Sequence, residues 1–83
     1  MITAAQMKAA RALLGIDQRE LARLSGLSLP TIQRMEASNG TVRAVVDSLE
    51  KVVIALNGAG VELIGAGARS EGSGRGVRLI EGA

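Results

Sequence analysis

The sequence predicts a small, mainly α-helical protein of four or five helices that ends in a short β region. Aliphatic residues recur at spacings of three and four between residues 4 and 57, which is the pattern of helices with one buried face. Good helix caps and single glycines divide this stretch into separate segments. After residue 58 the composition changes to two short β-prone runs on either side of a Gly- and Ser-rich segment.

The first helix is expected over Ala4–Leu14. Thr3 can cap it, and Gln6 stands three residues later, which makes a capping box. Gly15 suits the left-handed conformation that ends many helices. The expected buried stripe of this helix consists of Met7, Ala10, Leu13 and Leu14.

Residues 17–36 predict two short helices joined by a tight turn. Asp17 and Glu20 form a second capping box, and Gly26 ends the first of these helices. Ser28 caps the second helix, about residues 28–38, and Pro30 falls in its first turn, where a missing N–H costs little. The residues expected to face inward are Leu21, Ala22, Leu24, Leu27, Ile32 and Met35. This arrangement is a helix-turn-helix, whose second helix enters the major groove of DNA.

The outward face of this second helix carries the predicted contacts with DNA bases. Leu29, Pro30, Gln33 and Arg34 share that face. Arg34 can donate to guanine O6 and N7, or it can clamp a phosphate, and Gln33 is the next candidate for base recognition. Leu29 and Pro30 can touch a thymine methyl group, or they can simply start the helix.

The combined motif resembles the Cro/C1-type (Xre-like) helix-turn-helix family of bacterial and phage regulators. The resemblance covers roughly residues 4–56 and leaves the C-terminal part outside it. The residues that carry it are Gln18, Glu20-Leu21-Ala22, Gly26, Ser28, Thr31-Ile32 and Glu36. It implies a four-to-five-helix Cro/C1-like helix-turn-helix domain. Leu29 and Pro30 depart from the more polar start of the recognition helix that many members have.

The resemblance also implies roles for residues outside the base-reading face. Arg11 and Glu36 stand where family members form an ion pair between the first helix and the end of the recognition helix; the alternative is two solvated charges. Gln18 and Arg43 stand where members contact the DNA backbone, and the first turn of a helix suits a phosphate. The alternatives are a solvated amide at Gln18 and a solvated side chain at Arg43. Ser28 and Thr31 flank the recognition helix and can donate to phosphate oxygens, although Ser28 is equally explained as a cap. The expected phosphate contacts are therefore Gln18, Ser28, Thr31 and Arg43.

A fourth long helix is expected over Val42–Asn57, with Thr41 as its cap. Its apolar stripe toward the core comprises positions 42, 45, 46, 49, 52, 53 and 56. Ile54 lies outside this stripe. It indicates either a wide core in a chain without aromatic residues or a contact with a second subunit.

Residues 59–83 are expected to form a β extension of the helical domain 1–58. Gly-Val-Glu-Leu-Ile and Gly-Val-Arg-Leu-Ile predict strands at Val61–Ile64 and Val77–Ile80, in which Glu62 and Arg78 can face one another. A flexible loop is expected over about residues 65–76. The strands pair either as a hairpin within one chain or by exchange across a dimer. The residues expected at the dimer contact are Ile54, Val61, Leu63, Val77 and Leu79.

Composition limits the function classes. The 83 residues include no aromatic residue, no cysteine and no histidine. The core must therefore be aliphatic, and the usual nucleophile–base pairs and thiolate or imidazole metal sites cannot form. We expect no enzyme activity, no cofactor and no metal. The net charge is only +2, but residues 1–43 hold six basic and three acidic residues, which is a modest bias toward nucleic acid. No signal peptide or membrane span is expected, and a cytoplasmic location is the default.

The sequence as a whole therefore predicts a site-specific DNA-binding regulator of transcription that acts on double-stranded DNA as a homodimer. The family resemblance favours repression. A small aliphatic core favours self-association. The alternative is a helix-turn-helix module that binds protein, such as an antiactivator or an antitoxin-type partner, with a toxin or an activator as its partner. No small-molecule ligand is expected.

Overall fold

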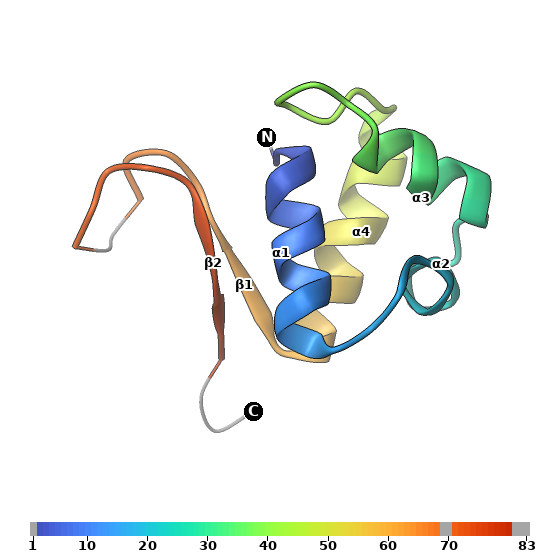
Figure 1. The fold of residues 1–83 in the computed structure, drawn as a ribbon, viewed down its shortest axis with the longest axis horizontal. Helices are drawn as coiled ribbons and strands as arrows, with labels where there is room; N and C mark the ends of the chain where they lie inside the picture. Colours follow the sequence, from blue (N-terminus) through green and yellow to red (C-terminus); the bar gives the residue numbers. More distant parts are fainter. Residues whose placement is uncertain (1, 69–70, 81–83) are drawn as a thin grey trace.

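The computed structural model describes residues 2–68 and 71–80, in which four helices precede one two-stranded antiparallel sheet. The elements are α1 (Ala4–Leu14), α2 (Gln18–Ser25), α3 (Leu29–Glu36), α4 (Val46–Ala59), β1 (Val61–Ile64) and β2 (Gly76–Leu79). The helices gather on one side, and the hairpin lies along α1 with its strands away from α2 and α3 (Figure 1). The expected mainly α fold with a small C-terminal sheet is confirmed.

Local capping explains where the first three helices begin and end. The Thr3 hydroxyl accepts from Gln6 N, and Gln6 Oε1 accepts from Thr3 N, so the first predicted capping box is complete. Asp17 accepts from Glu20 N at 2.8 Å, but Glu20 does not return the bond, because its carboxylate pairs with Arg23. The second capping box is therefore half formed.

The apolar core consists of Ala, Val, Ile, Leu and Met side chains and draws on all four helices and β1. Its fully buried side chains include Met7, Leu21, Ile32, Met35, Val42, Val52, Leu56 and Val61. Leu13 and Leu24, expected to face inward, are exposed. On a helix Leu13 points about 120° away from Met7 whereas Leu14 differs by only about 20°, so Leu14 packs against the core and Leu13 does not.

The predicted start of the fourth helix is wrong: α4 begins at Val46, not Val42. The start of the chain pairs with residues 40–42, which keeps this segment out of the helix. Thr3 and Thr41 form an isolated antiparallel bridge, Ala4 N donates to Gly40 O and Val42 N donates to Ile2 O, each at 2.9 Å. Thr41 therefore does not cap the helix.

The shifted start also changes which side chains of α4 face the core. Val45 occupies the N-cap without a side-chain hydrogen bond. Val42 is buried from the extended segment, while Val45 and Val46, expected in the core stripe, are exposed.

The C-terminal strands pair with one another within one chain. Val61 lies opposite Leu79 and Leu63 opposite Val77. Glu62 faces Arg78, as predicted, and their side chains form an ion pair at 2.6 Å. The second strand begins one residue before the predicted bound and ends at Leu79. Residues 69–70 of the predicted loop and residues 81–83 of the predicted extension lie outside the described residues.

One buried side chain connects the hairpin to the helices. The Gln6 amide nitrogen donates to Ile64 O at 2.9 Å and to Gly76 O at 3.0 Å. Gln6 thus connects the first turn of α1 to both strands of the hairpin, at the end of the ladder where Ile64 pairs with Gly76. Val61 is fully buried in the helical core, so the hairpin packs against the helices from its first residue.

Candidate nucleic-acid interface

The two faces of α3 differ as a recognition helix requires. Ile32 and Met35 are fully buried, whereas Pro30, Gln33 and Arg34 are exposed. Leu29 is half-buried and packs against the core, which leaves only part of its surface for another molecule. Pro30, Gln33 and Arg34 are therefore the predicted base contacts that the structure leaves accessible.

The beginning of α3 carries two hydroxyl groups that already bind each other. Ser28 Oγ accepts from Thr31 N at 3.2 Å and lies 2.8 Å from Thr31 Oγ1. One of the two hydroxyl hydrogens is used in this pair. The pair can therefore offer one O–H, not two, to a phosphate oxygen.

A buried carboxylate joins α1, α2 and α3. The Glu36 side chain is only 1% exposed, and Arg11 binds it with two parallel hydrogen bonds of 2.7 Å, from Nε to Oε2 and from Nη2 to Oε1. This arrangement is the bidentate geometry that makes Arg–carboxylate pairs strong. The hydrogen bond to Glu36 raises the pKa of Arg11 above its usual value. The two residues expected to pair from the family resemblance are thus in direct contact.

Gln18 completes this network and is oriented by it. Its amide nitrogen donates to Glu36 Oε1 at 3.0 Å. Because an ionised carboxylate only accepts hydrogen bonds, the NH₂ end of the amide must face Glu36. One amide N–H is used in this way and the second remains. Gln18 is the first residue of α2, where backbone N–H groups have no partner within the helix.

The accessible cations lie on more than one element. Within residues 2–68 and 71–80, ion pairs engage Arg11, Arg23, Lys51 and Arg78, and none engages Arg19, Arg34 or Arg43. Arg34 lies on α3, and Arg43 lies in the segment that follows it, where its backbone N donates to Ser38 Oγ. Arg19 is exposed in the first turn of α2. The sequence predicts no role for Arg19, which directly follows Gln18 in the chain.

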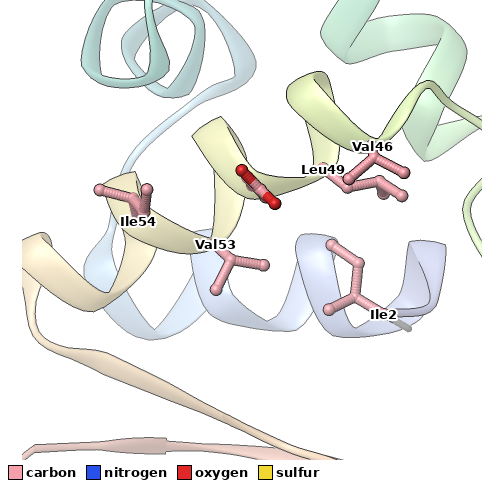
Figure 2. A pocket seen from close by; sticks show the side chains of 6 residues that line it. Ile2, Val46, Leu49, Val53 and Ile54 are labelled. Carbon is pink, nitrogen blue, oxygen red and sulfur yellow. The ribbon is translucent and has the colours of Figure 1, made fainter.

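The residues predicted for dimerisation fall in two separate places. Ile54, 68% exposed, lines an apolar hollow of about 350 Å³ on α4 together with Ile2, Val46, Leu49, Glu50 and Val53 (Figure 2). Leu63, Val77 and Leu79 lie on the hairpin, which contributes no residue to that hollow. Val61 is fully buried in the core of its own chain. It therefore has no surface for a second subunit, and that part of the prediction is corrected.

In the described part of the chain, no group of three or more His, Cys, Asp or Glu residues is arranged to hold a metal ion. None of the four helices has the length and apolar character needed to cross a lipid bilayer.

A helix-turn-helix family model of the Cro/C1 type matches residues 7–58, from the first turns of α1 to near the end of α4. This range includes α2, α3 and the Arg11–Glu36 pair. No curated protein shows significant similarity to the chain.

Proposed function

Because the chain belongs to the Cro/C1-type helix-turn-helix family, whose members are DNA-binding regulators, we propose that it is a sequence-specific repressor of transcription that binds its operator as a homodimer. In this proposal α3 lies in the major groove, and each subunit reads one half-site. Half-sites about one helical turn apart, roughly 34–36 Å, match the symmetry of such a dimer. Repression follows from covering a promoter.

The observation that carries the proposal is the exposed face of α3, with Gln33 and Arg34 side by side above a buried face. Arg34 has no ion-pair partner among the described residues, so its guanidinium is available to guanine O6 and N7. Gln33 can bond adenine through N6 and N7. A good contact of this kind contributes about 1–3 kcal/mol of discrimination between bases. Pro30 lies in the first turn of α3 on the same face and contributes apolar contact.

Contacts with the phosphate backbone of DNA would position this face of α3. Gln18 offers its second amide N–H, the Ser28–Thr31 pair offers one O–H, and Arg43 offers a charge beyond the end of α3. Arg19 adds a further cation beside Gln18. The Arg11–Glu36 pair does not contact DNA in this scheme; it holds Gln18 through the hydrogen bond to Glu36. Each phosphate neutralised by a cation steepens the salt dependence of binding by about 0.9 in log–log slope.

Selection of bound sequences from random duplex DNA tests the proposal and supplies an operator. We then expect Arg34→Ala to weaken operator binding by about 1–3 kcal/mol and to relax specificity at one base position. Arg75→Ala is the matched control, because it removes one exposed positive charge from the hairpin rather than from α3. Fluorescence anisotropy at two salt concentrations measures both variants. Equal losses for Arg34→Ala and Arg75→Ala would show that α3 does not read bases.

A second candidate function is a protein-binding module, and one observation favours it. The beginning of α3 presents Leu29 and Pro30, of which Leu29 is half-buried and Pro30 exposed. An apolar start suits a protein partner such as a toxin or an activator better than it suits the phosphate backbone. The same experiment separates the two: a protein-binding module enriches no sequence, and its weak DNA binding disappears as salt is raised.

A further inference from the structure

The outer edge of β2 has main-chain groups that the hairpin does not use. Ile80 N donates to Gly60 O at 2.8 Å, which continues the register in which Arg78 lies opposite Glu62. Hydrogen-bonded pairs alternate along an antiparallel ladder, so the main-chain groups of Arg78 face β1 while those of Val77 and Leu79 face outward. No hydrogen bond from the described residues reaches these outward groups. The edge therefore offers two N–H and two C=O groups.

This edge has only part of the usual protection against strand pairing. Natural edge strands are guarded by proline, bulges, charged side chains or short length, and β2 is short, with four residues. The only proline in the chain is Pro30 in α3, and the only charged side chain of β2 is Arg78, which Glu62 neutralises within the same hairpin. Leu79 is 49% exposed even though its partner Val61 is fully buried. The sheet thus ends at a strand whose apolar face is only half covered.

We propose that β2 pairs antiparallel with β2 of a second copy of this chain, forming a continuous four-stranded sheet across the dimer. The proposal rests on the homodimer proposed above and names the surface that builds it. A two-fold axis beside Arg78 places Val77 opposite Leu79 of the partner copy. In this register both outward residues of each strand are hydrogen-bonded, and the two strands share about four main-chain hydrogen bonds.

The side chains are self-complementary in the same register. On the face toward the helices, each row across the sheet runs Leu63, Val77, Leu79 of the partner copy and Val61 of the partner copy, so it is aliphatic throughout. On the other face the row carries Glu62, the two Arg78 side chains and the second Glu62, so each cation keeps its own carboxylate. The two Arg78 side chains lie opposite one another at the two-fold axis, and each is already paired with Glu62 of its own chain. The second copy therefore covers Leu79 without leaving a charge unpaired.

Cysteine cross-linking tests the pairing directly, because the chain has no cysteine of its own. In the proposed dimer, Arg78 lies at the two-fold axis opposite Arg78 of the partner copy. This pair is non-hydrogen-bonded, so its two Cα atoms are about 4.5 Å apart, within the range of a disulfide. We expect Arg78→Cys to form a covalent dimer under mild oxidation, visible on a non-reducing gel. Glu62→Cys is the matched control: it lies on the same face, but the two copies are about three strand spacings, roughly 14 Å, apart. It should stay monomeric on the gel.

A second pair of variants measures the equilibrium. Leu79→Pro removes an outward N–H, and the hairpin keeps its own bonds because that N–H faces away from β1. Two hydrogen bonds are lost per dimer, so we expect the dimer Kd to rise about 10- to 100-fold in analytical ultracentrifugation. Ile54→Lys, which places a charge in the α4 hollow, should leave the dimer Kd unchanged. Circular dichroism checks that both variants fold.

The outcomes separate this inference from the proposed function. Equal cross-linking of Arg78→Cys and Glu62→Cys overturns the β2 pairing, and so does a dimer that Ile54→Lys dissociates but Leu79→Pro does not. A wild-type chain that stays monomeric overturns the pairing together with the homodimer. A chain that cross-links through Arg78→Cys but selects no DNA sequence supports the pairing and removes the repressor function alone.

Discussion

The helix-turn-helix region and the hairpin each contain one inter-element Arg–Glu ion pair, and the two pairs differ in burial. Arg11 and Glu36 are 20% and 1% exposed, and a third group, the Gln18 amide, binds the same carboxylate. Arg78 and Glu62 are 53% and 49% exposed and face solvent. The same two residue types thus connect three helices in one region and form an exposed pair on the surface of two strands in the other.

The difference shows how each region obtains its rigidity. In the helix-turn-helix region a desolvated charge makes any other arrangement costly, because an unpaired buried carboxylate is strongly unfavourable. In the hairpin an isolated two-stranded sheet is marginal in water, so its order comes from contacts outside itself: Val61 in the core, Gln6 on α1 and, in our proposal, a second subunit. Three substitutions test this contrast.

The largest effect is expected for Arg11→Ala. Removing the guanidinium leaves Glu36 buried without its cation, so we expect a loss of about 3–5 kcal/mol in unfolding free energy, measured by urea denaturation. The double variant Arg11→Met with Glu36→Leu serves as its control and should recover much of that loss, since neither charge remains. A cost below about 1 kcal/mol for Arg11→Ala would show that Glu36 is solvated.

An intermediate effect is expected for Gln6→Ala, which disconnects the hairpin from α1. The variant leaves Ile64 O and Gly76 O without their shared donor and also breaks the capping box at Thr3. Unsatisfied buried groups cost about 1–3 kcal/mol. Hydrogen exchange should show faster exchange in β1 and β2 than in α2 and α3. Uniform acceleration over the whole chain would mean that the hairpin and the helices unfold as one unit.

The smallest effect is expected for Arg78→Ala. Exposed ion pairs contribute about 0–1 kcal/mol, so thermal unfolding of the variant should resemble that of the wild-type chain at low protein concentration, where the monomer dominates. A melting temperature lowered as far as that of Arg11→Ala would contradict the contrast between the two pairs. The result also validates Arg78→Cys as a cross-linking site, because it measures what loss of the arginine does to the fold.

Local sequence signals determined most of the secondary structure. Thr3, Asp17 and Ser28 cap helices in the structure as predicted, and Gly15 and Gly26 end them in the left-handed conformation. These interactions span three or four residues, so residue type and spacing suffice to predict them. The pairing of Glu62 with Arg78 was also predictable from the sequence. The two similar pentapeptides have the same alternation of side chains between the two faces of a strand.

Only the tertiary structure decided the features that depend on residues far apart in the chain. The start of α4 moved because the N-terminal residues pair with residues 40–42, and no property of Thr41 or Val42 reveals that bridge. Gln6 reads as a capping residue, yet its amide also bonds two strands that lie 58 and 70 residues away. The sequence predicts a phosphate contact or a solvated amide at Gln18, yet its amide also donates to Glu36, which fixes its orientation. Amino-acid spacing reports what a residue can do within its own turn or strand, whereas burial and nonlocal hydrogen bonds depend on what packs against it.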